Sequence, residues 1–188
     1  THRINVQGCG TQAAAIIAGG FQNPPPARRD EVELYDGSAW TETTDLPRAS
    51  SSGNMAGTQT AALFLGGYDA PYVNTVVAWD GSSWTEAADL TTVRGQSHAW
   101  GTQTDCIIAS GYGGTDSSLT TKVEQYDGTS WTEITDCSTQ RTRGGYGGGP
   151  TSSSGIIMGG ADPAVSPTSS TATEEFTSAV TARSVDTT

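Results

Sequence analysis

Lysine, histidine and long apolar runs are scarce in this sequence. Lys122 is the single lysine, and Lys and Arg together number 9 against 20 Asp and Glu, a formal net charge of −11. Proteins that bind nucleic acid neutralise phosphates with clustered Lys and Arg, so we expect no nucleic-acid partner. No apolar run approaches the roughly 20 residues that span a bilayer, so we expect no membrane insertion.

Small hydroxyl residues and glycine are abundant instead. The 188 residues include 29 Thr, 20 Ser and 24 Gly. Glycine costs about 1 kcal/mol at a helical position, and Ser and Thr compete with the helical backbone for hydrogen bonds. The composition therefore disfavours helices and predicts an all-β chain of the length of one domain.

A first motif recurs four times and divides the chain into units of similar length. It is an apolar run of strand length that ends on a pair of small residues, and Gly-Thr-Gln precedes the first three runs. The pairs are Gly19 with Gly20, Gly66 with Gly67, Ser110 with Gly111, and Gly159 with Gly160. Such internal repetition predicts a repeat architecture.

A second motif follows each pair after a gap of variable length. It reads aromatic-Asp-Gly-x-x-Trp-Thr-Glu and occurs three times, with a fourth, degraded copy that keeps the aromatic residue alone. The aromatic positions are Tyr35, Trp79, Tyr126 and Phe176, and the tryptophans are Trp40, Trp84 and Trp131. Asp-Gly is a strong hairpin signal because both residues tolerate positive φ, so it joins the third and fourth strands of each unit.

Each unit therefore predicts four short antiparallel strands, with approximate boundaries 1–46, 47–91, 92–139 and 140–188. A single unit cannot cover both of its faces, but units stacked about an axis cover one another in a β-propeller. The glycine pairs would let the second strand end where packing leaves no room for Cβ. Each tryptophan of the second motif would fill the space between neighbouring blades.

These motifs resemble kelch repeats, in which an apolar run and Gly-Gly are followed by a spaced Tyr and then a Trp. The resemblance covers about residues 3–180. The tandem units are similar to the kelch-like repeat proteins of bacteriophage tails and fibres and of environmental viral sequences. The resemblance implies an all-β propeller of four kelch-like blades, either a closed ring of four or part of a larger ring or array. We favour the closed ring, because the chain starts at a first strand and ends at a fourth.

No catalytic residue, metal site or cofactor is expected. Some kelch propellers are copper oxidases, which need imidazole and phenolate ligands on one metal, but His2 and His98 are the only histidines. Cys9 and Cys106 occupy positions where other units have apolar residues, and the three cysteines, with Cys137, are interpreted as small buried hydrophobes. Most arginines recur at the junctions between units, where we expect structural ion pairs with the acids of the Trp-Thr-Glu segments.

The loops between the second and third strands vary between units, and variable loops on a repeated scaffold usually carry binding. They span 21–29, 68–74, 112–120 and 161–171. Within them, aromatic rings and carboxylates could stack on and hydrogen-bond a sugar ring. The candidate ligand-binding residues are Tyr68, Asp69, Tyr72, Tyr112 and Asp116.

The function that this pattern favours is a non-enzymatic structural and binding module of a virion, in a tail or fibre, or of another extracellular surface. Its expected partners are protein neighbours in a larger assembly, including further copies of itself, and surface glycans. Two alternatives remain open. One is a glycan-active hydrolase with a propeller active site, and the other is a subunit that assembles into extracellular fibres.

Overall fold

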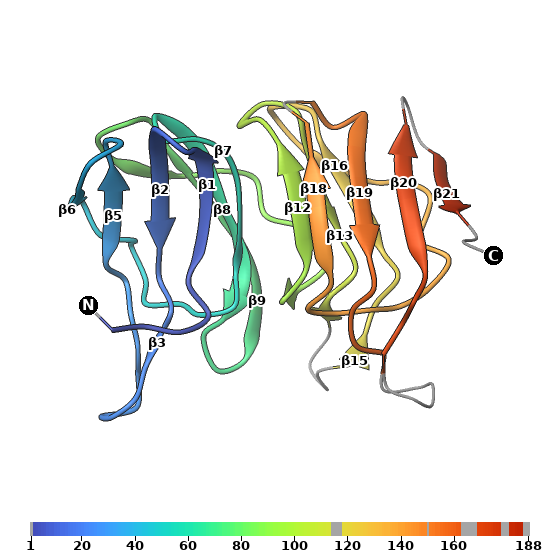
Figure 1. Cartoon of the computed structure of the whole chain (residues 1–188), viewed down its shortest axis with the longest axis horizontal. Helices are drawn as coiled ribbons and strands as arrows, with labels where there is room; N and C mark the ends of the chain where they lie inside the picture. Colours follow the sequence, from blue (N-terminus) through green and yellow to red (C-terminus); the bar gives the residue numbers. More distant parts are fainter. Residues whose placement is uncertain (1, 114–117, 150, 163–168, 178–180, 186–188) are drawn as a thin grey trace.

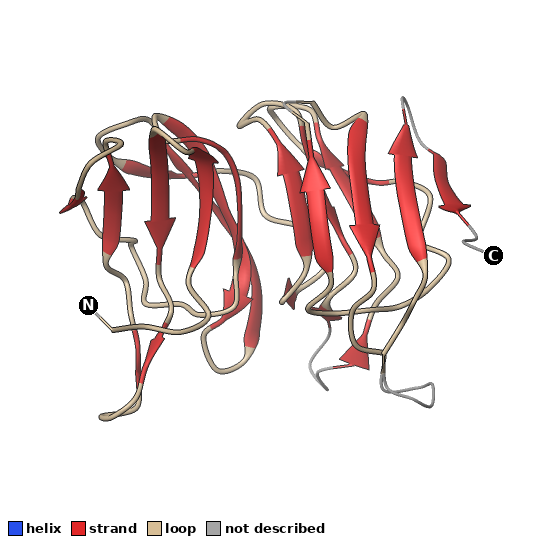
Figure 2. Cartoon of the chain, viewed as in Figure 1, coloured by secondary structure: helices blue, strands red, loops and turns tan. Residues whose placement is uncertain are grey.

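The computed structural model describes residues 2–113, 118–149, 151–162, 169–177 and 181–185. The described residues form strands, turns and loops. They contain no helix, and therefore no helix long and apolar enough to cross a membrane. Figure 2 shows this all-strand composition in red. The expected all-β fold is confirmed.

Four antiparallel sheets of four strands follow one another along the chain, and each keeps its strands in chain order. Sheet 1 contains β1 (Gln7–Thr11), β2 (Ala14–Ala18), β5 (Val32–Tyr35) and β6 (Trp40–Glu42). Sheet 2 contains β7 (Asn54–Thr58), β8 (Ala61–Tyr68), β9 (Tyr72–Trp79) and β10 (Trp84–Glu86). Sheet 3 contains β12 (His98–Gly101), β13 (Cys106–Ala109), β16 (Val123–Tyr126) and β17 (Trp131–Glu133). Sheet 4 contains β18 (Gly145–Gly148), β19 (Ser154–Met158), β20 (Thr173–Thr177) and β21 (Thr181–Val185).

Two small sheets form in the loops between these strands. One contains β3 (Phe21–Gln22) and β4 (Ala27–Arg28), and the other contains β11 (Arg94–Gly95), β14 (Tyr112–Gly113) and β15 (Ser118–Leu119). Figure 1 shows that the described parts of the loops between second and third strands lie at the lower end of the molecule. The recurring Gly-Thr-Gln and Asp-Gly turns lie at the upper end. The described parts of the variable loops therefore share the opposite end, as the sequence predicts.

The first strand of each sheet lies innermost. β1 lies beside β7, β7 beside β12, and β12 beside β18, whereas β18 and β1 make no comparable contact among the described residues. In Figure 1, sheets 1 and 4 stand at the left and right, with sheets 2 and 3 between and behind them. The four inner strands share a hollow of about 390 Å³. The expected closed ring of four blades is not confirmed by this arrangement.

A hydrophobic cluster fills the space between each pair of consecutive sheets. Ile16 and Phe64 belong to the cluster between sheets 1 and 2, and Leu65 and Ile108 to that between sheets 2 and 3. Trp100 belongs to the third cluster, between sheets 3 and 4. Because each sheet covers one face of the next, most of the apolar area that stabilises the chain is buried between sheets rather than within them.

The glutamine of Gly-Thr-Gln joins sheet 2 to sheet 1, and sheet 3 to sheet 2. Gln59 Nε2 donates to two carbonyl oxygens of sheet 1, those of Ala15 at 3.1 Å and Tyr35 at 2.6 Å. Gln103 Nε2 makes the same two contacts with sheet 2 at 3.2 and 2.6 Å. The repeated motif therefore specifies contact between sheets as well as a turn.

Two of the three tryptophans of the second motif also donate a hydrogen bond to the preceding unit. Trp84 Nε1 donates to the Thr44 carbonyl at 3.1 Å, and Trp131 Nε1 donates to the Ala88 carbonyl at 2.9 Å. Trp40 has no sheet before it and is 47% exposed. Its expected role as a filler between blades is wrong in this structure, because the partner face is missing.

The Asp-Gly turns differ in detail from the expected hairpin. Gly37 has a φ of 95°, but Asp36 is not among the residues of positive φ. Instead, Asp36 Oδ1 accepts hydrogen bonds from the backbone N–H groups of Ser38 at 2.8 Å and Ala39 at 2.9 Å. These bonds lower the pKa of the carboxyl to about 2. The aspartate therefore acts through its side chain, as in an Asx turn.

Buried ion pairs form where the sequence predicts arginines, but with other partners. Arg94 and Glu124 are fully buried and pair at 2.5 Å, and Arg141 pairs with Glu174 at 2.6 Å. These glutamates lie two residues before the aromatic position, not in the Trp-Thr-Glu segments. The expected pairing is therefore wrong, because the Trp-Thr-Glu strand lies at the outer edge while the arginine side chain runs between sheets.

The glycine pairs meet a steric demand. Gly66 and Gly67 have φ of 57° and 113°, and a Cβ at Gly66 would lie 2.3 Å from the Arg94 carbonyl oxygen. Ser110 takes the first position in sheet 3 with a φ of 57°. At sheet 2 the predicted lack of room for Cβ is confirmed. The predicted strand end is wrong there, because β8 continues through the pair to Tyr68 after a shift of register between Leu65 and Gly67.

The cysteines and His98 are packing residues. Cys106 and Cys137 are buried, Cys9 is half-buried, and all three are free thiols. His98 is buried, and its Nε2 accepts a hydrogen bond from the Gly144 N–H at 3.1 Å. Burial lowers the pKa of His98 to about 4, so the imidazole is neutral at pH 7.

The buried histidine predicts acid sensitivity. Its pKa is below the unfolded value of about 6.5, so its contribution is complete above pH 6.5 and is lost as the pH falls toward 4. We expect urea unfolding to show a loss in the native chain, between pH 7.5 and 4.5, that exceeds the loss in His98→Gln by about 2 kcal/mol. Parallel losses in the two chains would contradict this.

Candidate functional site

A recess of about 380 Å³ opens at the end of the molecule that carries the variable loops. It is formed where the inner ends of sheets 1, 2 and 3 meet. Its lining residues are Asn5, Phe21, Arg28, Ser51, Ser52, Tyr68, Tyr72 and Gln96. They combine two phenol rings, one cation and several neutral hydrogen-bonding groups.

The structure brings together the three tyrosines that the sequence predicts. Tyr68 meets Tyr72 edge-on with ring centroids 4.9 Å apart, and Tyr72 stacks on Tyr112 at 5.9 Å with an interplanar angle of 20°. The guanidinium of Arg28 lies 4.7 Å from the centre of the Tyr68 ring. The result is a continuous aromatic surface with a cation over one of its rings.

The two predicted carboxylates do not join this surface. Asp69 Oδ2 pairs with Arg48 Nε at 2.8 Å, so its charge is already balanced by a neighbouring side chain. Asp116 lies outside the described residues. The tyrosines, not the aspartates, therefore define the candidate site.

Tyr72 is the central ring of the group. Burial raises the pKa of its hydroxyl, the neighbouring Tyr112 and Tyr68 raise it further, and Arg143 opposes them. The hydroxyl therefore stays protonated throughout the neutral range and can donate a hydrogen bond. Gly95 allows the ring to lie so close, since a Cβ there would be 2.8 Å from a Tyr72 ring carbon.

A feature that the sequence did not predict surrounds the recess. The residue two positions before each inner strand is a non-glycine residue in the left-handed region, with φ between 51° and 59°. These residues are Asn5, Ser52, Gln96 and Arg143. Such backbone persists only where its surroundings hold it in place. Four different side chains occupy the position, so no repeated residue marks it in the sequence.

Hydrogen bonds link these residues from sheet to sheet. The Ser52 N–H donates to the Asn5 carbonyl at 3.3 Å, and the Gln96 N–H donates to the Ser52 carbonyl at 2.7 Å. Arg143 Nε donates to Gln96 Oε1 at 2.7 Å. The floor of the recess is therefore tied together across the sheets, which pre-organises the groups that face it.

The described lining of the recess offers groups for stacking and hydrogen bonding. None of its eight lining residues is a carboxylate. Within the described ranges, no group of three or more His, Cys, Asp or Glu side chains converges as a metal-binding set. A flat, polar, uncharged ligand suits this combination of groups.

The fold class is supported by comparison with a known structure, whereas the sequence matches no family model and no curated protein. The chain is similar to the solved structure of a protein called YjhT, with a TM-score of 0.79 and 15% sequence identity. The match covers 95% of this chain and 68% of that chain. At this identity the likeness concerns the fold alone, an array of repeated β-sheets consistent with a β-propeller.

Proposed function

We propose that the four sheets are consecutive blades of a β-propeller and that the chain is a non-enzymatic binding module, which holds a saccharide ring in the recess beside Tyr72. Its place is the surface of a virion or another extracellular surface, among protein neighbours. The composition, with one lysine and many Thr and Ser, supports that location, as does the resemblance of the repeats to phage tail and fibre proteins.

Two observations support a propeller that is not closed by these four blades. Consecutive inner strands lie side by side through the series, but the last and first do not. The matched part is 68% of the YjhT chain, so the rest of that chain is about half as long as the matched part. The spacing of the sheets therefore suits a ring of more than four blades, and the larger-ring alternative is the one that we propose.

The observation that carries the binding proposal is the group of stacked tyrosines with Arg28. Sugar rings present an apolar face of C–H groups and a rim of hydroxyls, and they pack on aromatic rings while their hydroxyls bond to neighbouring polar groups. Ser51, Ser52 and Gln96 supply such groups beside the rings.

The hydrolase alternative is less well supported. Most glycosidases use two carboxylates on either side of the scissile bond, and the recess lining contains none. Asp69, the one predicted acid among the described residues, pairs with Arg48. We therefore propose binding without turnover.

A glycan array combined with a reducing-sugar assay tests this proposal. We expect binding to a subset of glycans and no release of reducing ends. Tyr72→Ala should weaken that binding about tenfold, which corresponds to about 1.4 kcal/mol of lost stacking. Tyr146→Ala removes an exposed tyrosine outside the recess and should leave affinity unchanged. Turnover of any bound glycan, or equal effects of the two substitutions, would refute the proposal.

A further inference from the structure

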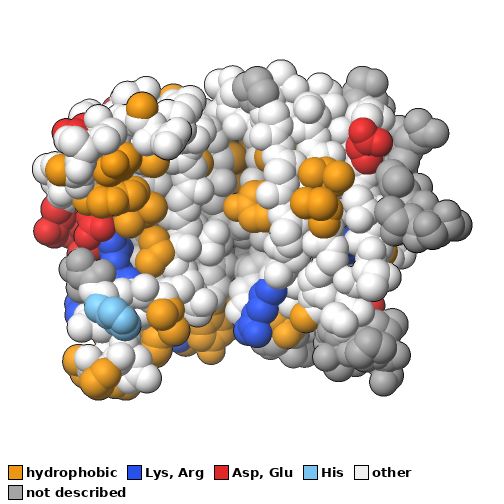
Figure 3. Space-filling view, viewed as in Figure 1, with side chains coloured by type: hydrophobic (Ala, Val, Ile, Leu, Met, Phe, Trp, Pro, Cys, Tyr) orange, Lys and Arg blue, Asp and Glu red, His pale blue; other side chains and the backbone are white. Residues whose placement is uncertain are grey.

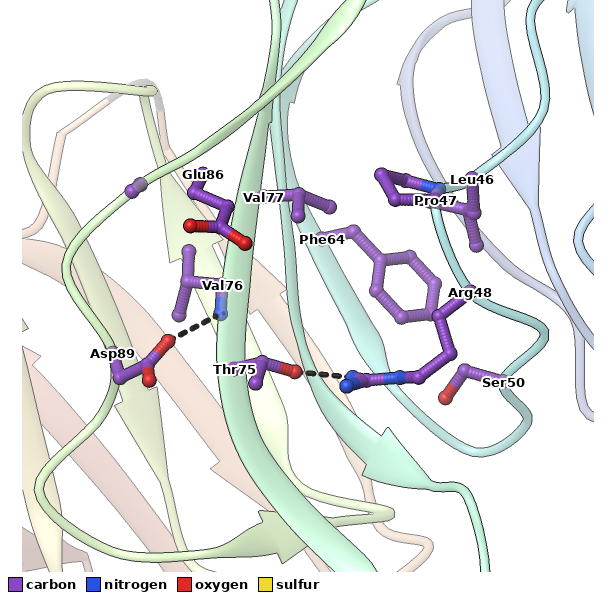
Figure 4. A pocket seen from close by; sticks show the side chains of 11 residues that line it. Leu46, Pro47, Arg48, Ser50, Phe64, Thr75, Val76, Val77, Glu86 and Asp89 are labelled. Atoms are coloured by element: carbon purple, nitrogen blue, oxygen red, sulfur yellow. Dashed lines mark hydrogen bonds between the residues drawn. The ribbon is translucent and has the colours of Figure 1, made fainter.

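A pocket of about 510 Å³ lies away from the recess, at the junction between sheets 1 and 2. Figure 4 shows its wall, in which Phe64 and Val77 of sheet 2 face Leu46 and Pro47 of the connecting segment. Arg48 and Glu86 lie at its sides. The volume is that of sites for small organic ligands.

The corresponding space in the next sheet is filled by a buried arginine. Arg94 Nη2 bonds to Glu124 at 2.5 Å, and its Nη1 donates to the Lys122 carbonyl at 2.9 Å. The second oxygen of Glu124 accepts the Thr91 N–H at 2.6 Å. The guanidinium, the carboxylate and the backbone N–H thus bond to one another directly, and Arg94 Nε is left without a hydrogen-bond partner among the described residues.

Sheet 4 repeats this arrangement. Arg141 donates to the Ala172 carbonyl at 2.7 Å and pairs with Glu174, which accepts the Ser138 N–H at 2.7 Å. In sheet 1, Arg3 donates to the Glu31 carbonyl at 2.6 Å. An arginine therefore bonds to the equivalent carbonyl in three of the four sheets.

In sheet 2 the arginine, the glutamate and the backbone N–H donor are all replaced. By strand register, Val77 stands where Glu124 stands in sheet 3, since they pair with the equivalent residues Phe64 and Ile108. Ser50 takes the place of Arg94, each four residues after a buried leucine. Pro47 takes the place of Thr91 and has no N–H to donate. The pocket is the space that the arginine leaves.

Polar groups remain in that space without the partner that the other sheets provide. Thr75 holds the position of Lys122 and lines the pocket, so its carbonyl lacks the arginine donor found in the other sheets. Ser50 is 1% exposed, and its Oγ has no hydrogen-bond partner. Arg48 does not replace the missing guanidinium, because it bonds to the Thr75 hydroxyl and to Asp69.

The charges around the pocket favour a neutral occupant. A buried cation needs a carboxylate, and Val77 has taken its place; a buried anion needs N–H donors, and Pro47 has removed one. Two carboxylates, those of Glu86 and Asp89, also line the pocket, but both residues are exposed to solvent, where their attraction for a cation is weak. Asp89 Oδ1 already accepts a hydrogen bond from the Val76 N–H at 3.2 Å. Phe64, Leu46 and Val77 offer an apolar wall for a flat body.

We propose that this pocket binds a small neutral molecule that carries an amide-like N–H donor on a compact aromatic or aliphatic body. The N–H group takes the place of the absent arginine, donating to the Thr75 carbonyl or to Ser50 Oγ. The body packs against Phe64 and Leu46. The pocket is separate from the recess, so the inference does not rest on saccharide binding.

Three compounds of one size test both the site and the charge. Benzamide is neutral, benzamidinium is a cation and benzoate is an anion. In NMR titrations of the 15N-labelled chain, benzamide should shift the signals of Phe64, Thr75 and Val77 with a Kd in the millimolar range or below. The two ions should bind at least about tenfold more weakly. Equal or tighter binding of benzamidinium, or no shifts with 10 mM benzamide, would overturn the proposal.

The chain supplies its own matched control. The triple substitution Pro47→Thr, Ser50→Arg and Val77→Glu builds the arrangement of sheet 3 into sheet 2 and should abolish the benzamide shifts. Val77→Leu, which narrows the pocket without a buried charge, should weaken binding at least about threefold if the triple variant does not fold. Tyr72→Ala should leave benzamide binding unchanged. Unchanged binding in the filled variants would place the compound elsewhere and refute the site.

Discussion

Glu124→Val is expected to lower the free energy of unfolding by about 3–5 kcal/mol, because it leaves the guanidinium of Arg94 buried without its counter-charge. Both side chains are fully buried, 2.5 Å apart. The arginine cannot reach water by changing rotamer, since it lies between sheets 2 and 3. Urea unfolding at pH 7 measures the loss.

Sheet 2 shows a set of substitutions that removes the buried ion pair without leaving an unpaired charge. Pro47, Ser50 and Val77 remove the N–H, the cation and the carboxylate together. We therefore expect the triple variant Thr91→Pro, Arg94→Ser and Glu124→Val to be more stable than Glu124→Val alone, although it carries more changes. The three single losses should sum to more than the triple loss, as for residues that act as one unit. Additive losses would contradict this reading of the repeat.

Trp100→Ala is expected to cost about 3–5 kcal/mol, the usual range for truncating a buried aromatic side chain. Trp100 is 4% exposed, and its ring centroid is 4.8 Å from that of Phe176 in sheet 4. Its Nε1 also donates to the Ser152 carbonyl at 3.1 Å. The substitution therefore removes a large apolar contact and a hydrogen bond between sheets 3 and 4, and thermal or urea unfolding should show the loss directly.

Two glycines of sheet 4 provide the matching test. A Cβ at Gly155 or at Gly148 would lie 2.1 Å from an atom of Trp100. Gly155→Ala should therefore destabilise the native chain by about 1–3 kcal/mol through overpacking. In the Trp100→Ala background the same change should cost little. An equal cost in both backgrounds would show that the glycine is required for another reason.

The strands and their order could be predicted from the sequence because the apolar run recurs in all four units and the other motifs in three of them. Gly-Thr-Gln and Asp-Gly each lie at the turn between two strands, as predicted. The pair of small residues follows the second strand in sheets 1, 3 and 4, but in sheet 2 it lies inside β8. In the run of glycines before Pro150, Gly148 leaves room for Trp100, since a Cβ there would lie 2.1 Å from an atom of that side chain. Local chemistry and register were sufficient for these features.

The relation between first and last sheets could not be predicted in this way. Each motif describes a sheet and its contact with the preceding one, so it leaves the curvature of the series open. The exposure of Trp40 and the separation of β18 from β1 depend on the angle between sheets. Small residues in the inner strands permit several such angles, and no residue pattern selects one.

The candidate site was predicted only in part. The tyrosines were found because aromatic residues in variable loops are unusual enough to notice. Arg28 was interpreted as structural, since its approach to Tyr68 depends on the fold of a loop between β3 and β4. The pocket at Ser50 and Val77 could have been found by aligning the units and asking which of them lacks the arginine and the glutamate.

The central claim is that consecutive sheets repeat one contact, in which the motif tryptophan of sheets 2 and 3 bonds to the chain of the sheet before it. Hydrogen exchange of the indole N–H groups, followed by NMR in the native chain, tests it most directly. We expect slow exchange at Trp131 and Trp84, which bond to Ala88 and Thr44, and exchange near the unprotected rate at Trp40. Equal exchange rates at all three tryptophans would contradict the account.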